Sequence, residues 1–222
     1  MSVDKVAVIG GTGDEGFGLA LRWARAGIEI VIGSRDEGRG QAAAAKLKEL
    51  VPDAAVTGME NGAAAASSEL LMVTVPFAAQ AGIYKSIADH VRPDSVVIDG
   101  TVPVAASVGA KVTHTLGVWE GSAAQQAAAL LPKGTRTCAA FHSLAASALN
   151  DPDYDMEGDV LVCGPKSAKP TVHALVEAIP GLRYVDAGPL ENARIVEPLT
   201  ALLIGINHRY DTDRSGIRIT GI

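Results

Sequence analysis

The fold is decided by the stretch Val6-Ala7-Val8-Ile9-Gly10-Gly11-Thr12-Gly13-Asp14-Glu15-Gly16. Its apolar start predicts a buried strand, and the glycines of Gly11-x-Gly13-x-x-Gly16 follow that strand directly and open a helix. Glycines at these positions allow a tight turn in which backbone N–H groups approach a pyrophosphate, whose charge the helix N-terminus stabilises. The stretch therefore predicts a Rossmann-type dinucleotide-binding fold; the alternative is a tight turn that binds no ligand.

The second apolar run ends in Ile32-Gly33-Ser34-Arg35, and this ending indicates which dinucleotide binds. NAD-selective folds place an acidic residue there, which accepts hydrogen bonds from the ribose hydroxyls. A serine hydroxyl and an arginine instead suit the 2′-phosphate of NADP, and Arg39 adds a second cation one helical turn later. We therefore predict NADP(H). The alternative is that Arg35 only caps a loop and that Asp36 reaches the ribose of NAD.

Short apolar runs alternate with Ala-rich helical stretches along the chain, and this alternation is typical of a parallel sheet. Runs that are apolar on both faces belong inside such a sheet, and the right-handed crossover rule makes it doubly wound. The predicted strands are Lys5–Ile9, Ile28–Ile32, Leu70–Val75, Val96–Asp99, Thr135–Ala140 and Asp159–Cys163. The predicted helices are Gly16–Ala26, Gly38–Leu50, Phe77–His90 and Ser122–Leu131.

The chain is long enough for one full α/β domain and a smaller appendage. We predict an NADP-binding Rossmann domain over residues 1–150, which includes an irregular crossing from Gly100 to Gly121. Residues 151–222 are then a small C-terminal α/β lobe. Its predicted elements, after the strand at Asp159, are a helix over Ser167–Ile179, a short strand over Arg183–Val185 and a final helix from Glu191 to about Asn207.

Composition argues against several kinds of partner. The 222 residues carry a net charge of -6, whereas a nucleic-acid surface is normally basic, so no nucleic acid is expected. The apolar runs are shorter than the ~18 residues of a membrane span and no signal peptide is evident, so we expect no membrane partner and a cytoplasmic protein. Cys138 and Cys163 lie in apolar segments and the five histidines are scattered, so no metal site is expected.

Further residues follow predicted strands at the carboxyl edge, where such sheets bind ligands. Thr74-Val75-Pro76 puts a rigid turn before Phe77, which either stacks near a nicotinamide or is a core aromatic, and Asp99-Gly100-Thr101 closes another strand. His142 either donates a hydrogen bond or proton to a bound ring or is structural. Hydride transfer between stacked rings needs no nucleophile, and the sequence contains no Tyr-x-x-x-Lys pair of the short-chain dehydrogenase kind.

A series of motifs in fixed order extends over nearly the whole chain. They are Gly10-Gly11-Thr12-Gly13-Asp14, Gly33-Ser34-Arg35, Thr74-Val75-Pro76-Phe77, Ala140-Phe141-His142, the stretch from Val185 to Arg194 and Gly216-Ile217-Arg218-Ile219-Thr220-Gly221. On these motifs the chain resembles the NADPH-dependent reductases of the deazaflavin coenzyme F-420 (F420). The glycine loop is shared with many Rossmann enzymes, whereas the last two motifs are particular to this family.

The resemblance implies reversible hydride transfer between C4 of the nicotinamide and C5 of the deazaflavin, in a homodimer. By matching motif positions it implies that His142 and Leu144 line the deazaflavin. It implies NADP(H) contacts at Gly11, Thr12, Gly13, Asp14, Glu15, Ser34, Arg35, Arg39, Phe77, Val104 and Ala146. One departure is that Asp211 and Asp213 precede Arg214 in a segment that is commonly basic in the family, which weakens the expected attraction for the anionic coenzyme tail.

Two other functions stay open. An imine or pyrroline-carboxylate reductase would share the nucleotide domain but would need a large helical C-terminal domain, for which the part of the chain after Asn150 is short. A non-catalytic protein that senses NADP(H) would keep the phosphate loop without an open cleft beside the nicotinamide. Because the resemblance continues beyond the nucleotide domain, the sequence favours the F420 reductase.

Overall fold

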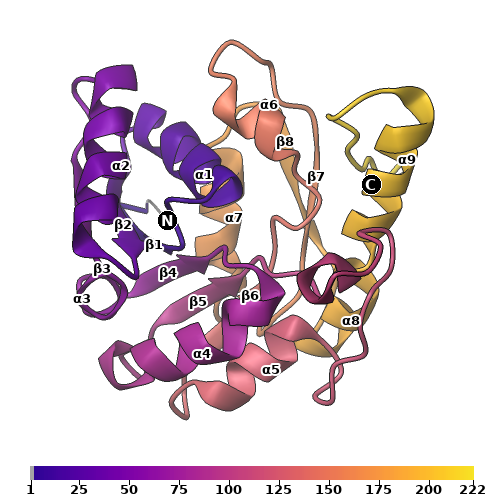
Figure 1. Ribbon diagram of the computed structural model, residues 1–222, viewed down its shortest axis with the longest axis horizontal. Helices are drawn as coiled ribbons and strands as arrows, with labels where there is room; N and C mark the ends of the chain where they lie inside the picture. The colour runs from indigo at the N-terminus through magenta and orange to yellow at the C-terminus, as the bar shows by residue number, and fades with distance from the viewer. Residues whose placement is uncertain (1–2) are drawn as a thin grey trace.

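A six-stranded parallel sheet forms the centre of the structure, which is a computed structural model that describes residues 3–222 (Figure 1). Its strand order is β3-β2-β1-β4-β5-β6 and every neighbouring pair is parallel. The strands are β1 Lys5–Ile9, β2 Glu29–Ser34, β3 Val56–Glu60, β4 Leu70–Val73, β5 Val96–Asp99 and β6 Arg136–Ala139. The predicted Rossmann-type, doubly wound parallel sheet is therefore confirmed.

Helices cover both faces of this sheet, because its strands are apolar on both sides. Val6 and Val8 of β1 belong to one hydrophobic cluster and Ala7 and Ile9 to the other, as the alternation of side chains along a strand requires. The first cluster includes residues of α1 Asp14–Arg25, α2 Glu37–Leu50 and α7 Lys169–Glu177. The second includes residues of α3 Asn61–Ala66, α4 Phe77–Ile87 and α5 Ala123–Leu130.

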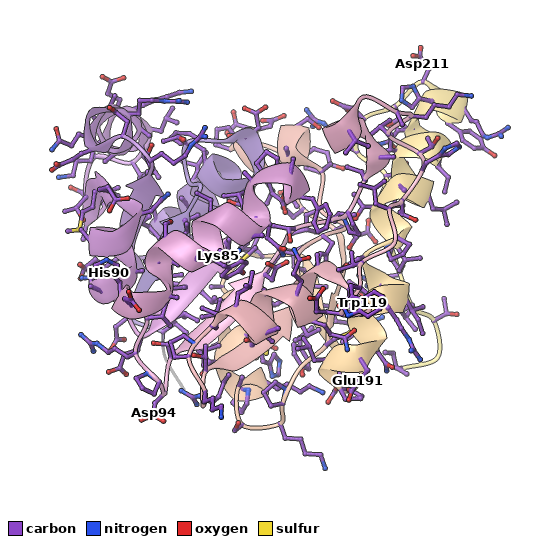
Figure 2. The ribbon with its side chains drawn as sticks, turned by 60° about the horizontal axis from the view of Figure 1, so that its bottom comes forward. Lys85, His90, Asp94, Trp119, Glu191 and Asp211 are labelled. Atoms are coloured by element: carbon purple, nitrogen blue, oxygen red, sulfur yellow. The ribbon has the colours of Figure 1, made fainter. Side chains whose placement is uncertain are left out.

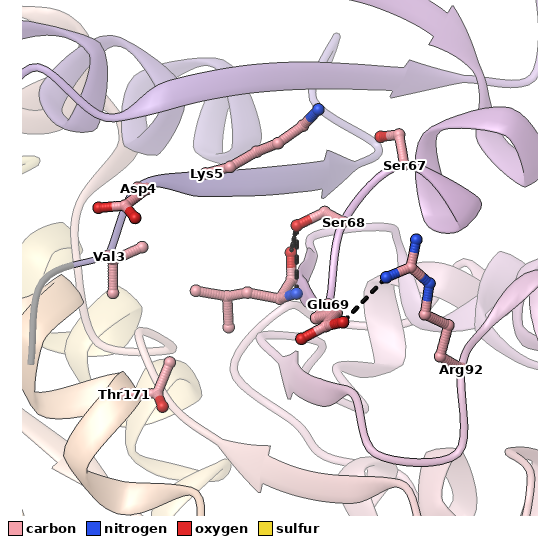
Figure 3. A pocket seen from close by; sticks show the side chains of 9 residues that line it. Val3, Asp4, Lys5, Ser67, Ser68, Glu69, Arg92 and Thr171 are labelled. Carbon is pink, nitrogen blue, oxygen red and sulfur yellow. Dashed lines mark hydrogen bonds and ion pairs between the residues drawn. The ribbon is translucent and has the colours of Figure 1, made fainter.

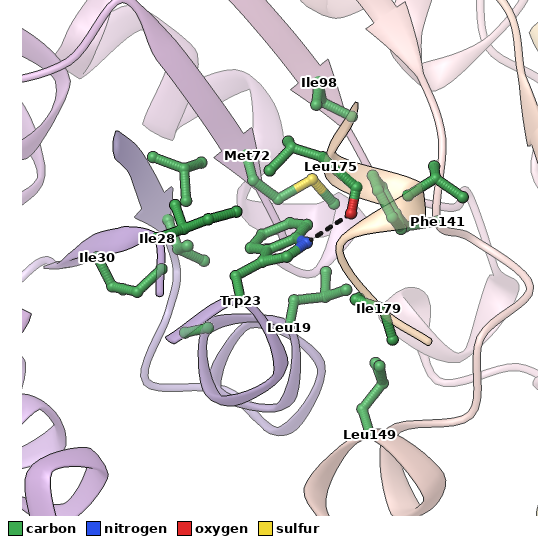
Figure 4. Close-up of a cluster of buried hydrophobic side chains, with 14 of the residues drawn as sticks. Leu19, Trp23, Ile28, Ile30, Met72, Ile98, Phe141, Leu149, Leu175 and Ile179 are labelled. Atoms are coloured by element: carbon green, nitrogen blue, oxygen red, sulfur yellow. Dashed lines mark hydrogen bonds between the residues drawn. The ribbon is translucent and has the colours of Figure 1, made fainter. Parts of the chain in front are cut away.

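The C-terminal part of the chain shares this core. Trp23 of α1 is fully buried and donates a hydrogen bond from Nε1 to the carbonyl oxygen of Leu175 in α7 at 2.9 Å (Figure 4). Its ring also meets Phe141 edge to face, with the ring centroids 5.5 Å apart. One hydrophobic cluster thus extends from β1 to α7, and residues beyond 150 cover a face of the Rossmann sheet.

A second, two-stranded parallel sheet pairs β7 Gly158–Val162 with β8 Leu182–Asp186. The buried Asp159 of β7 accepts hydrogen bonds from Arg183 Nε and Nη2, both at 2.8 Å, and from the amide of Ile219 at 2.6 Å. Arg183 also donates from Nη1 to the Ile222 carbonyl oxygen at 2.8 Å. This ion pair fastens the motif from Gly216 to Gly221 to the edge of the small sheet.

The remaining elements are short, except for the last helix. They are the 3₁₀ helices Ala88–His90, Ala105–Val108 and Leu190–Asn192, and the helices α6 Ala146–Asn150, α8 Ala193–Val196 and α9 Leu199–Tyr210. The prediction of one continuous helix from Glu191 to about Asn207 is wrong. The segment forms three separate helices, Leu190–Asn192, α8 and α9, and Pro198 stands immediately before α9. Proline lacks an N–H and clashes with the preceding turn, which explains a break there.

Strand β3 was not among the predicted strands. It is an edge strand with the sequence Val-Thr-Gly-Met-Glu, of which only Val56 is fully buried. A Cβ on Gly58 would lie 2.2 Å from the carbonyl carbon of Gly40, so glycine is required for α2 to pack against this strand. An edge strand with a glycine at its centre lacks the apolar run that indicates a strand.

Across residues 3–222, no helix combines the length and hydrophobicity needed to cross a membrane.

Candidate functional site

The glycine loop joins β1 to α1 at the carboxyl edge of the sheet. Gly11 N donates to Val8 O at 3.2 Å and Gly13 N donates to Gly10 O at 3.0 Å, which closes the turn. A Cβ on Gly16 would lie 2.4 Å from Thr74 Oγ1, so only glycine allows α1 to approach β4 this closely. The helix is capped by Gly13, which has no side chain, and its first amides are therefore available to an anionic ligand.

A cavity of about 260 Å³ opens beside this loop. It lies between β1 and β4, where the chain's strand order runs outward to β2 and β3 on one side and to β5 and β6 on the other. This is the switch point at which open α/β sheets bind their ligands. Of the residues predicted to bind NADP(H), the ones that line it are Thr12, Gly13, Ser34, Arg35 and Arg39. Strands β1 and β2 thus bring the phosphate loop and the two arginines to one cavity, although more than twenty positions separate them in the chain.

Asp36, the alternative ribose ligand, is engaged elsewhere. Its Oδ1 accepts a hydrogen bond from the Arg39 amide at 2.8 Å and caps the N-terminus of α2. The Asp36 amide itself donates to Ser34 Oγ at 3.3 Å. The structure therefore gives Asp36 a capping role and leaves Ser34, Arg35 and Arg39 to line the cavity beside the glycine loop.

The end of β5 carries a buried polar network centred on Asp99. Oδ2 accepts hydrogen bonds from Tyr84 Oη at 2.6 Å and from Gln80 Nε2 at 2.9 Å, and Oδ1 accepts one from the Thr101 amide at 3.0 Å. Burial raises the pKa of Asp99, while these hydrogen bonds oppose the rise by favouring the ionised form. Sequence reasoning identified Asp99 and Thr101 as a strand end but missed Tyr84 and Gln80, which α4 brings across.

Glu197 joins the C-terminal part of the chain to this edge of the sheet. It is almost fully buried, and its carboxylate accepts hydrogen bonds from the amides of Ala123 at 2.9 Å and Ala124 at 3.0 Å, in the first turn of α5. Burial raises the pKa of Glu197 to about 7, although both amides favour its ionised form. Sequence reasoning missed this residue because a glutamate in a helical pattern normally faces solvent.

His142 follows β6 at the same edge, after an unusual backbone turn. Phe141 adopts φ 70°, a left-handed conformation that costs energy for a residue with a side chain, and it is buried against Trp23. His142 is 5% exposed, and within residues 3–222 neither of its ring nitrogens has a hydrogen-bond partner. Burial lowers the pKa of His142 to about 4, against a smaller opposing effect of the Asp99 backbone. The imidazole is therefore neutral at pH 7.

A second cavity, of about 240 Å³, contains His142. Leu144 and Ala146 line it from the same segment, so both predicted deazaflavin residues meet here, together with one that was predicted to contact NADP(H). The opposite wall comes from α9 and the residues after it, including Thr200, Asn207, Asp213 and Ser215. Thr200 Oγ1 donates to the His142 carbonyl oxygen at 2.8 Å, which ties the two walls together.

The other predicted site residues are not part of the walls of these two cavities. Gly11 is buried inside the glycine loop, and Asp14 and Glu15 occupy the first turn of α1. Phe77 is the half-buried first residue of α4 and follows Pro76, which lines the nucleotide cavity. Val104 forms an isolated antiparallel bridge with Thr115.

A third cavity, of about 330 Å³, lies at the opposite, amino-terminal ends of β1 and β4 (Figure 3). Its principal charges neutralise each other, because Arg92 Nη1 lies 2.9 Å from Glu69 Oε1. Sheets of this kind bind ligands at the carboxyl ends of their strands, so this cavity is not the nucleotide site. In the described part of the chain, no group of three or more His, Cys, Asp or Glu residues is arranged to hold a metal ion.

The strand order, the glycine loop and the cavity at the switch point define a Rossmann-type dinucleotide-binding protein. Residues 5–103 match the family described as NADP oxidoreductase, coenzyme F420-dependent. An F420-dependent NADP reductase of Methanothermobacter thermautotrophicus is 46% identical over 99% of this chain and 96% of its own length. One of Methanocaldococcus jannaschii is 38% identical over 98% and 99%. The chain therefore belongs to the family of F420-dependent NADP oxidoreductases.

A solved structure has the same fold over its full length. It is described as a putative F420-dependent NADP-reductase from Arthrobacter sp. FB24, and it superposes with a TM-score of 0.82 over 99% of this chain and 100% of that chain. Its sequence identity is 21%, so this likeness establishes the fold alone. The family membership, which rests on the closer sequence relatives, favours the F420 reductase over an imine or pyrroline-carboxylate reductase.

Proposed function

We propose that this protein is an oxidoreductase that transfers hydride reversibly between NADP(H) and the deazaflavin coenzyme F-420. Its relatives over nearly the full length are named F420-dependent NADP reductases. The structural observation that carries the proposal is that two cavities open at the carboxyl edge of one sheet. The first lies beside the glycine loop with Ser34, Arg35 and Arg39 in its wall, and the second contains His142, which follows β6.

The residues around the first cavity fit NADP(H). The glycine loop offers first-turn amides to the pyrophosphate, since Gly13 leaves that turn uncapped, and Asp14 and Glu15 belong to the same turn. Ser34, Arg35 and Arg39 bind the 2′-phosphate, because guanidinium groups form charge-assisted hydrogen bonds with phosphate oxygens. We place the nicotinamide at the carboxyl edge of β4 and β5, with Phe77, Val104 and Ala146 as its apolar contacts.

The second cavity fits the deazaflavin ring, with Leu144 as an apolar contact and His142 as a polar one. When both coenzymes are bound, they supply the hydride chemistry between nicotinamide C4 and deazaflavin C5, and the protein contributes mainly their alignment. His142 is neutral at pH 7, so it donates a hydrogen bond to the ring from one nitrogen and does not act as a charged acid. The C-terminal lobe, residues 151–222, supplies the opposite wall.

We further propose that the protein is a cytoplasmic homodimer. Large apolar side chains are exposed on the C-terminal helices, where Ile195 of α8 is 62% exposed and Leu202 of α9 is 59% exposed. Trp119, which lines a hollow with Leu190 and Glu191, is 98% exposed (Figure 2). Such residues are typical of a surface that a second copy covers. The buried, free thiols of Cys138 and Cys163 suit a reducing compartment. Size-exclusion chromatography with light scattering measures the oligomeric state, and a monomer at micromolar concentration would refute the dimer.

The activity is tested by mixing the protein with NADPH and oxidised F420 and following the loss of the deazaflavin's visible absorbance. The proposal expects bleaching with NADPH that is much slower with NADH. No bleaching by a protein that demonstrably binds NADPH would overturn it.

The role of Arg35 is tested separately with Arg35→Ala. Loss of a charge-assisted hydrogen bond of about 1.5–3 kcal/mol should reduce the preference for NADPH over NADH by roughly 10- to 100-fold. Lys48→Ala, which removes an exposed cation from the last turn of α2, is the matched control and should leave the preference unchanged. An unchanged preference in Arg35→Ala would remove this residue from 2′-phosphate recognition.

A further inference from the structure

Glu15 holds an unusual position in the first turn of α1, directly after the glycine loop. The side chain is half-buried, and its Oε1 atom is fully buried without a hydrogen-bond partner among residues 3–222. A buried carboxylate oxygen without a partner is costly, so such an atom normally has a function or a bound ligand to explain it. The neighbouring Asp14 is exposed and needs no such explanation.

Asp99 of β5 is the charged group that acts on Glu15, and its charge is negative. Tyr84 of α4 donates a hydrogen bond to Asp99, and the charge of Asp99 also acts on Glu197, beside the first turn of α5. The pKa of His142, whose ring interacts with the Asp99 backbone, is lowered to about 4. Burial, reinforced by the charge of Asp99, raises the pKa of Glu15 to about 8. The raised pKa favours the protonated carboxyl near neutral pH, and a protonated Glu15 does not repel the coenzyme's pyrophosphate.

A second orphaned group points to a ligand at the same place. Within the described part of the chain, neither ring nitrogen of the buried His142 makes a well-aligned hydrogen bond, although the Asp99 backbone acts on the ring. Glu15 and His142 therefore both interact with Asp99 and both keep hydrogen-bonding capacity for a ligand. A bound ring with polar substituents and variable charge would satisfy both groups.

We propose that the Glu15 carboxyl group faces the nicotinamide ring of bound NADP(H) and lets the site distinguish the oxidised coenzyme from the reduced one by charge. This inference rests on the placement of NADP(H) proposed above. The nicotinamide ring of NADP⁺ carries a positive charge, whereas that of NADPH is neutral. Binding of NADP⁺ therefore favours the ionised carboxylate, so the Glu15 O–H bond breaks and the proton leaves to solvent; binding of NADPH leaves Glu15 protonated.

If Glu15 changes its charge in this way, the preference of the protein for NADP⁺ over NADPH should depend on pH. The dissociation constants of NADP⁺ and NADPH are measured by isothermal titration calorimetry between pH 6.5 and 9, without deazaflavin, so that no turnover is needed. The pyrophosphate and 2′-phosphate are common to both coenzymes, so their titration cancels in the ratio of the two constants. A difference of one unit in the pKa of Glu15 between the two complexes makes NADP⁺ about tenfold more favoured at the alkaline end.

Two variants separate Glu15 from other groups. Glu15→Gln keeps the shape of the side chain but cannot ionise. The ratio of its dissociation constants for NADP⁺ and NADPH should therefore be constant over the pH range. Glu49→Gln removes an exposed carboxylate from α2 and should keep the tenfold change of the wild type. Titrations in buffers of different ionisation enthalpy should show proton release with NADP⁺ near pH 7.5 in the wild type and none in Glu15→Gln.

The inference is overturned if the ratio in the wild type stays within twofold over the pH range, a result that does not depend on any variant folding. It is also overturned if Glu15→Gln keeps the pH-dependent ratio. If the wild-type protein binds neither coenzyme, the proposed NADP(H) site itself fails. If both coenzymes bind with a constant ratio, the NADP(H) site stands and only the role of Glu15 is lost.

Discussion

Trp23 offers a sharp test of how the C-terminal part of the chain is attached to the nucleotide-binding sheet. Its indole is fully buried between α1 and α7, donates the 2.9 Å hydrogen bond to Leu175 O and meets Phe141 edge to face. In Trp23→Phe the aromatic contact is largely kept, but the hydrogen bond is lost and the smaller ring leaves a void. We expect a large loss of stability from a conservative substitution.

The size of this loss follows from the two changes. The Leu175 carbonyl oxygen would remain buried without its donor, which costs about 1–2 kcal/mol. The smaller ring leaves roughly 40 Å³ of empty volume, which at about 24 cal/mol per Å³ costs about 1 kcal/mol more. The free energy of unfolding should therefore fall by about 2–3 kcal/mol.

Urea denaturation followed by far-UV circular dichroism measures this change as a lower midpoint with an unchanged m-value. Tyr210 is 77% exposed, so Tyr210→Phe, which removes one hydroxyl from an exposed aromatic side chain, is a control that should change stability by less than about 0.5 kcal/mol. If Trp23→Phe is as stable as the control, the close packing of α7 on α1 is refuted. A lower m-value instead would show that residues 151–222 unfold separately.

Two further predictions concern the C-terminal segment. Because burial raises the pKa of Glu197 to about 7, above its unfolded value near 4.5, the folded state binds more protons and this residue's contribution to stability falls as pH rises from about 4.5 to 7. Glu197→Gln should therefore flatten the pH dependence of the urea midpoint over that range, and an identical profile would exclude a buried, titrating Glu197. Arg183→Met removes the hydrogen bonds from Arg183 to Asp159 and to the C-terminal segment, and should loosen the motif from Gly216 to Gly221. The KM for F420 should then rise by on the order of tenfold, with the KM for NADPH unchanged. Equal changes in both KM values would show that the motif from Gly216 to Gly221 does not act specifically on the second cavity.

Much of the fold could be predicted from local sequence patterns. The run from Val6 to Gly16 combines an apolar strand with glycines that exclude side chains, and both signals come from residues adjacent in the chain. Ser34, Arg35 and Arg39 were predicted in the same way, because they follow a strand whose end must lie at the ligand edge, and the structure brings them to one cavity. Such patterns fail where tertiary packing or a single residue determines the secondary structure. Strand β3 has no apolar run, and Pro198 divides an otherwise helical pattern.

The sequence by itself predicted that a dinucleotide binds at the glycine loop and, through Ser34 and Arg35, that this dinucleotide is NADP(H). It also indicated the reductase family through motifs at both ends of the chain. Only the tertiary structure shifts the pKa values at the site, because burial and the influence of Asp99 depend on residues far apart in the sequence. Burial lowers the pKa of His142 and raises that of Glu15, because a charge is stable in a folded protein only where solvent or a partner supports it.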